Sequence, residues 1–142
     1  MRKVIKTSHQ IESPIQAVWS IIAQGDKVES WLPIISESTL GDGNRRYCSL
    51  QDGSRIEETI LKSDINYTFL YAIDKQESFP IENAVGLIRL AEGAQGGTEL
   101  FWDLEFDVAE EALFNEFRTT VEQVYAASAA QLQEISRVQA TI

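Results

Sequence analysis

The sequence predicts one α+β domain in which a curved antiparallel sheet wraps around a long C-terminal helix, with two short helices after the first strand. Residues 34–107 form a series of short β-rich runs separated by turn signals. Residues 110–137 contain no Gly or Pro and carry a single apolar stripe. The chain shows no linker, charge block or internal repeat, so residues 1–142 are expected to form a single domain.

The N-terminal elements are predicted from local signals. Residues 4–11 alternate apolar and polar side chains, which is typical of a strand. Ser13 followed by Pro14 predicts a helix N-cap and the first helical residue, and this helix is expected to stop near Gly25. Residues 26–32 predict a second short helix.

The central β-rich segment predicts an antiparallel meander. Leu100, Trp102 and Leu104 alternate with residues 99, 101, 103 and 105, three of which are acidic. The apolar set is therefore expected on the buried face. The remaining strands are expected at the runs between the turn signals, which are residues 46–50, 55–61, 67–73, 84–90 and 99–106.

The long helix must bury its apolar stripe, and the concave face of the sheet is the only apolar surface large enough. Small residues face the same interior: Ala84 and Gly86 from a strand, and Ser128 from the helix. We therefore expect a cavity between sheet and helix. A core filled completely by bulky neighbours is the alternative.

Composition excludes several classes of protein. Lys and Arg number 12 against 22 Asp and Glu, so the net charge is −10. A nucleic-acid surface would need a basic footprint, and an anionic membrane would be repelled. No apolar run reaches the roughly 18 residues that cross a bilayer, so no membrane insertion is expected. The lone Cys48 and the lack of a signal-like N-terminus indicate a reducing cytoplasm.

Two charged residues are expected to face the interior. Glu58 shares a strand face with Ile56 and Ile60, and Arg46 lies on the preceding strand across a hairpin. One interpretation is that the pair orients a polar group of a ligand. The other is a structural ion pair, or a pair that lies at the cavity mouth in water.

Metal and cofactor sites are not expected. His9 is the single histidine and has no second ligand at metal-site spacing, and no serine stands on a nucleophile elbow. The glycine-rich residues 93–97 lack the Lys of a phosphate loop and predict a hairpin turn. Tyr71 could place its hydroxyl in the cavity, and Trp102 could form a wall.

Several segments in order resemble the START-like helix-grip superfamily, also called SRPBCC, and most closely its bacterial polyketide cyclase/dehydrase and lipid-transport-like branch. The segments that carry the resemblance are residues 11–19, 31–33, 46–53, 56–60 and 102–106. The resemblance implies a hydrophobic ligand pocket. Carried over loosely from plant abscisic-acid receptors of that superfamily, pocket positions would be Glu58, Tyr71, Ile73, Ala84, Gly86 and Ser128. The chain departs from those receptors at residues 51–54 and 74–80, so a hormone-receptor role is not expected.

The predicted function is binding of a small hydrophobic or amphipathic molecule, such as a lipid, a polyketide-like compound or an aromatic metabolite. The predicted ligand-binding residues are Arg46, Glu58, Tyr71, Ile73, Ala84, Gly86, Trp102, Val124 and Ser128. One alternative is a cyclase or dehydratase that uses Glu58, Tyr71 and His9 as acid–base groups. Another is a non-catalytic protein-interaction module. The expected partner is a small hydrophobic ligand, without nucleic acid, and the chain is expected to be a monomer or homodimer.

Overall fold

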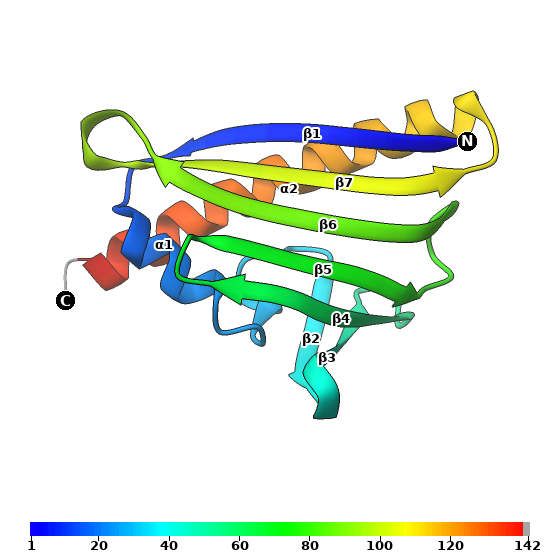
Figure 1. The fold of residues 1–142 in the computed structure, drawn as a ribbon, viewed down its shortest axis with the longest axis horizontal. Coiled ribbons are helices and arrows are strands. Elements are labelled where there is room, and N and C mark those ends of the chain that lie inside the picture. The colour runs from blue at the N-terminus through cyan, green and yellow to red at the C-terminus, as the bar shows by residue number, and fades with distance from the viewer. Residues whose placement is uncertain (141–142) are drawn as a thin grey trace.

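Seven antiparallel strands form one curved sheet in the order β1-β7-β6-β5-β4-β3-β2 (Figure 1). The structure, a computed structural model, describes residues 1–140, with side chains through Val138. The strands are β1 (Arg2–Ile11), β2 (Ile35–Leu40), β3 (Arg45–Leu50), β4 (Arg55–Asp64), β5 (Thr68–Lys75), β6 (Ile81–Glu92) and β7 (Thr98–Val108). Neighbours in the chain from β2 to β7 are neighbours in the sheet, which confirms the predicted meander.

The long helix α2 (Glu111–Ala140) runs along one face of the sheet, behind β1, β7 and β6 in Figure 1. Most residues of its apolar stripe are buried, among them Phe117, Tyr125 and Leu132. Its strongest packing against the sheet is with β1. The predicted α+β architecture, with a sheet wrapped around a C-terminal helix, is therefore confirmed.

Only one of the two short helices predicted after the first strand forms as an α-helix, α1 (Ile15–Ile22). The second is a single 3₁₀ turn, η1 (Val28–Ser30), because Lys27 adopts a left-handed backbone and interrupts it. The predicted cap at Ser13 is also wrong. Pro14 is itself the N-cap, and the buried Ser13 carbonyl accepts a hydrogen bond from Thr98 Oγ1 at 2.8 Å.

Strand β2 was not predicted from the sequence. Its side chains, Ile35 apart, are exposed or half-buried, so it lacks the apolar alternation of the other strands. It lies at the sheet edge and pairs only with β3 within the described chain. Figure 1 shows β2 and β3 turning away from the direction of the other strands, which curves this end of the sheet around the interior.

The inner sheet face follows the predicted alternation. On β7, Leu100, Trp102, Leu104 and Phe106 are all buried, while the residues between them are more exposed. Among residues 1–140, no helix is both long enough and apolar enough to cross a membrane.

Candidate ligand-binding cavity

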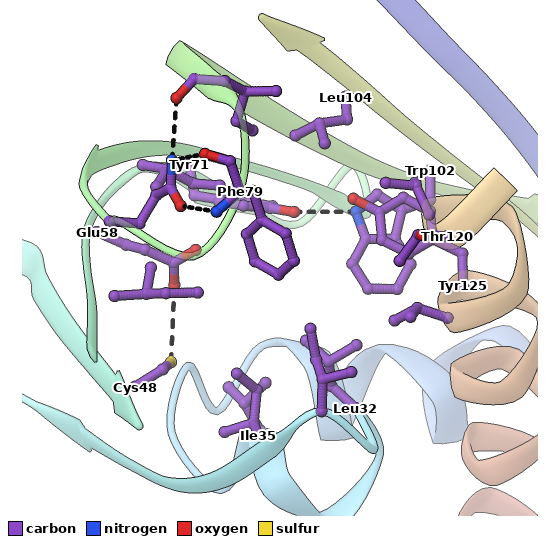
Figure 2. A pocket seen from close by; sticks show the side chains of 18 of the residues that line it. Leu32, Ile35, Cys48, Glu58, Tyr71, Phe79, Trp102, Leu104, Thr120 and Tyr125 are labelled. Atoms are coloured by element: carbon purple, nitrogen blue, oxygen red, sulfur yellow. Dashed lines mark hydrogen bonds between the residues drawn. The ribbon is translucent and has the colours of Figure 1, made fainter. Parts of the chain in front are cut away.

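A cavity of about 110 Å³ lies between the inner sheet face and α2. Strands β3 to β7 form its floor, and α2 forms its roof through side chains such as Phe117 and Val121. The segment around η1 closes one side with Trp31 and Leu32, and Leu32 is labelled in Figure 2. Thr120 lines the cavity and is also exposed to solvent, so the mouth lies at this turn of α2.

Sheet register places the polar end of the cavity. Arg46 on β3 is the cross-strand partner of Glu58 on β4. Glu58 in turn pairs with Ile73 on β5, and Ile73 pairs with Ala84 on β6. The four residues form a row across the inner face because side chains directly opposite in an antiparallel sheet point to the same side.

Arg46 and Glu58 form a buried ion pair, with Arg46 Nε donating to Glu58 Oε1 at 2.7 Å. Arg46 Nη1 also donates to the carbonyl of Gly25 at 3.1 Å, which ties the end of α1 to the sheet. Burial opposes the charge of Arg46, but the charge of Glu58 and its hydrogen bond outweigh this, so the pKa of Arg46 is raised. Both residues line the cavity, so the ion pair forms part of the cavity wall.

Trp102 and Tyr125 form the opposite end, and the Tyr71 side chain reaches toward them from beside Arg46. The Trp102 ring stacks on Tyr125 with centroids 3.7 Å apart, and its Nε1 donates to the Tyr71 hydroxyl at 3.0 Å (Figure 2). The Trp31 ring packs against the Trp102 ring, with ring centroids 5.7 Å apart. Burial raises the pKa of Tyr71 to about 12, with a further contribution from Glu58. Tyr71 is therefore a neutral phenol at physiological pH.

The structure brings most of the predicted site residues together at this cavity. Those that line it are Arg46, Glu58, Tyr71, Ile73, Trp102 and Val124.

Ala84, Gly86 and Ser128 are not among the lining residues. A Cβ atom at Gly86 would overlap the Tyr71 ring, so the space that the small residue leaves is filled by that ring. The Ser128 hydroxyl is fully buried and donates to the Val124 carbonyl at 2.8 Å. Ala84 lines a separate open depression of about 280 Å³ beside the β5–β6 connection. The expectation that these small residues widen the cavity is therefore wrong.

The β5–β6 connection contributes two residues that sequence reasoning did not select. The Gln76 amide accepts from Phe79 N at 2.8 Å and donates to the carbonyls of Phe79 and Ile81 at 3.2 and 2.9 Å. These bonds hold the loop so that the Phe79 ring points into the cavity (Figure 2). There it packs on the Phe117 ring, with ring centroids 5.6 Å apart. The proline and serine around Phe79 predict a loop, but no periodicity indicates its orientation.

The cysteine and the histidine differ in where they lie relative to the cavity. Cys48 lines the cavity and donates to Glu58 Oε1 at 3.8 Å, and burial raises the pKa of its thiol to about 12. His9 lies outside the cavity lining, and its buried Nε2 has no hydrogen-bond partner among the described residues. Within residues 1–140, no His, Cys, Asp and Glu side chains gather as a metal site.

Comparisons with solved structures agree with this geometry. XoxI from Bacillus cereus is 25% identical with a TM-score of 0.83, covering 92% of this chain and 93% of XoxI. A protein of unassigned function from Bacillus thuringiensis is 26% identical with a TM-score of 0.82, covering 93% and 97%. Ara h 8.0201 is 15% identical, with a TM-score of 0.71 over 94% of this chain and 99% of its own, and so shares the fold.

Comparison with curated proteins gives no significant match. The sequence profile of one family, described as polyketide cyclase/dehydrase and lipid transport, matches residues 2–137. This match spans nearly the whole chain and agrees with the helix-grip fold, in which the sheet encloses a long C-terminal helix. The chain therefore belongs to the polyketide cyclase/dehydrase and lipid transport family, within the START-like superfamily.

Proposed function

We propose that this protein binds a small, largely apolar molecule in the cavity between the sheet and α2, with Glu58 and Arg46 fixing its orientation. The observation that carries the proposal is the cavity itself, whose aromatic and aliphatic walls end at a buried ion pair. Binding sites for small molecules characteristically combine apolar walls with a few placed polar groups. Family membership also supports a hydrophobic ligand.

The energetics favour a compact ligand. Each Å² of apolar surface removed from water contributes roughly 25 cal/mol before ordering costs. A cavity of about 110 Å³ holds a molecule of about one small ring, with further atoms reaching the mouth at Thr120. Longer members of the predicted ligand classes would need Phe79 or Leu32 to move aside.

Binding is favoured over acid–base catalysis because the candidate acid–base groups in the cavity are already hydrogen-bonded or ion-paired within the protein. Tyr71 is hydrogen-bonded to Trp102, and Glu58 is paired with Arg46. His9, the third group in the enzyme hypothesis, lies outside the cavity lining. Among the residues that the structure describes, the interaction-module alternative has no comparable feature in its favour. A cytoplasmic location and a monomeric or homodimeric state stay predictions from the sequence.

A cavity-filling variant tests the proposal. Val124→Phe places a ring into the cavity from α2, whereas Ala126→Phe adds the same ring at an exposed position on the same helix. Native mass spectrometry of freshly purified protein should show a bound small molecule in the wild type and in Ala126→Phe but not in Val124→Phe. Absence of any adduct in the wild type, together with no change in its tryptophan indole NMR signals at saturating toluene, would contradict the proposal.

A further inference from the structure

The hydrogen-bonding capacity of Glu58 is unevenly used. Both of its hydrogen bonds end on Oε1, which accepts from Arg46 Nε at 2.7 Å and from Cys48 Sγ at 3.8 Å. Oε2 accepts no hydrogen bond from any residue that the structure describes. Among the described residues, the side-chain N and O atoms that are both fully buried and without a hydrogen-bond partner are His9 Nε2 and Arg45 Nε. Oε2 is not one of them, so it is not closed off from the cavity. Since Glu58 lines the cavity, Oε2 offers a free carboxylate oxygen at its wall.

Arg46 is more fully engaged than Glu58, and Nη2 is the one nitrogen of its guanidinium that donates no hydrogen bond to a described residue. Its Nε is used by Glu58 and its Nη1 by the Gly25 carbonyl. The guanidinium carbon lies 5.3 Å from the Phe69 ring centre and 5.4 Å from that of Tyr71, so aromatic rings flank the cation. Glu58 already balances its charge, and an anion entering the cavity would meet a second carboxylate at short range.

We propose that the cavity selects neutral molecules that carry a hydroxyl or N–H donor, which binds Glu58 Oε2, and that it discriminates against carboxylates. This inference rests on the proposed function and narrows it to a ligand class. A hydrogen bond to a carboxylate in a desolvated site strengthens binding by about ten- to a hundredfold relative to an analogue without the donor. An anion cannot donate to Oε2, loses its hydration and lies close to a second carboxylate.

The size of the cavity decides the probes. An engineered cavity of about 150 Å³ in another protein holds benzene, and the present cavity is about 110 Å³ with an open mouth. Phenol, anisole and benzoate share one ring and differ in the group attached to it. Phenol donates a hydrogen bond, anisole can only accept one, and benzoate carries a negative charge at neutral pH.

The test is an NMR titration of the ¹⁵N-labelled full chain at pH 7, following the three tryptophan indole signals. Trp31 and Trp102 line the cavity and report on occupancy, whereas Trp19 lies outside its lining. Phenol should bind about ten- to a hundredfold more tightly than anisole, and benzoate should bind most weakly. Glu58→Gln keeps the shape but removes the charge, so it should shrink the preference for phenol and relieve the exclusion of benzoate.

Glu57→Gln is the matched control, because it makes the same chemical change one residue away on the opposite sheet face and should leave all three affinities unchanged. If Glu58→Gln fails to fold, Arg46→Met/Glu58→Leu removes both charges at once and should likewise abolish the preference. Equal binding of phenol and anisole to the wild type would overturn the inference while leaving the proposed function intact. Benzoate binding more tightly than phenol, or a phenol preference that survives loss of Glu58, would also overturn it. Failure of all three probes to bind would instead count against the proposed function.

Discussion

Two halves of the sheet differ in how their inner faces are covered. Strand β1 packs against α2, and the inward residues Ile5 on β1 and Phe106 near the end of β7 lie in a filled core outside the cavity lining. The inward residues of β3 to β5, together with Ile88 on β6 and Trp102 on β7, line the cavity under α2, which the segment around η1 and the Phe79 loop help to close. The same alternation points side chains inward in both halves. The comparison teaches that the side chains of α2 fill the concave face beside β1 but only roof it farther along the sheet.

The ion pair is the sharpest difference between the halves, so breaking it should have the largest effect. Arg46→Met leaves the Glu58 carboxylate buried without its partner, and the free energy of unfolding should fall by about 3–5 kcal/mol. Arg46→Met/Glu58→Leu removes both charges and should recover most of this loss. Urea unfolding followed by tryptophan fluorescence measures both variants. A double variant no more stable than Arg46→Met would contradict this account.

Matched isoleucines compare the packing of the two halves directly. Ile5 and Ile88 are both 2% exposed, but Ile88 lines the cavity and Ile5 does not. Ile5→Ala should cost about 2–5 kcal/mol of stability. Ile88→Ala should cost less, because a side chain at a cavity wall has fewer neighbours to lose.

Ile88→Ala should also change ligand selection by widening the cavity, so that it binds a larger ring such as naphthalene more tightly than the wild type does. Chemical denaturation and ligand titration on the same samples separate the two effects. If both substitutions cost the same stability and leave affinity unchanged, the distinction between a filled half and a hollow half is wrong.

The aromatic end should be less sensitive than the ion pair. Tyr71→Phe removes the acceptor for the Trp102 indole N–H, which is then buried without a partner, at a cost of about 1–3 kcal/mol. Because the pKa of Tyr71 is raised to about 12, this loss should be the same from pH 6 to pH 9. Tyr125→Phe is the comparison variant: it keeps the ring that stacks on Trp102 and the Trp102–Tyr71 bond but loses the hydrogen bond between the Tyr125 and Tyr71 hydroxyls, so it should cost less than Tyr71→Phe. Thermal unfolding across this pH range provides the measurement.

The smallest expected effect lies in the filled half, at His9. Burial lowers the pKa of His9 in the folded chain below the value of about 6.5 expected when unfolded. The unfolded state therefore binds the proton more readily than the folded state does. The contribution of neutral His9 to the free energy of unfolding is lost as the pH falls from about 6.5 toward the folded pKa. His9→Leu should flatten the dependence of unfolding free energy on pH between 7 and 5. Equal slopes for the two proteins would show that His9 does not contribute.

Local pattern predicted the fold well because burial of one face imposes a period on each strand and on the long helix. The same rule placed Glu58 on the inner face, and its position across a hairpin from Arg46 follows from strand register. Strand β2 could not be predicted in this way, because an edge strand with exposed side chains such as Glu37 and Thr39 has no buried face to impose alternation.

The site was only partly predictable, because a cavity depends on where large side chains turn. Gly86 is small, but the sequence does not indicate that the Tyr71 ring lies across it. Ser128 lies on the buried stripe, but its hydroxyl bonds within its own helix. Phe79 reaches the cavity only because Gln76 fixes the loop, and those bonds link side chain to backbone in a segment without periodicity.

The contact between Gly86 and Tyr71 has a consequence for redesign of the protein. The phenol ring rests against bare backbone, so one added methyl group at position 86 would push the ring toward the interior. Gly86→Ala would thus act as a plug made from the protein's own aromatic side chain. A family member with a bulkier residue there would have to place this ring elsewhere, and the shape of its cavity would change without any alteration of the charged pair.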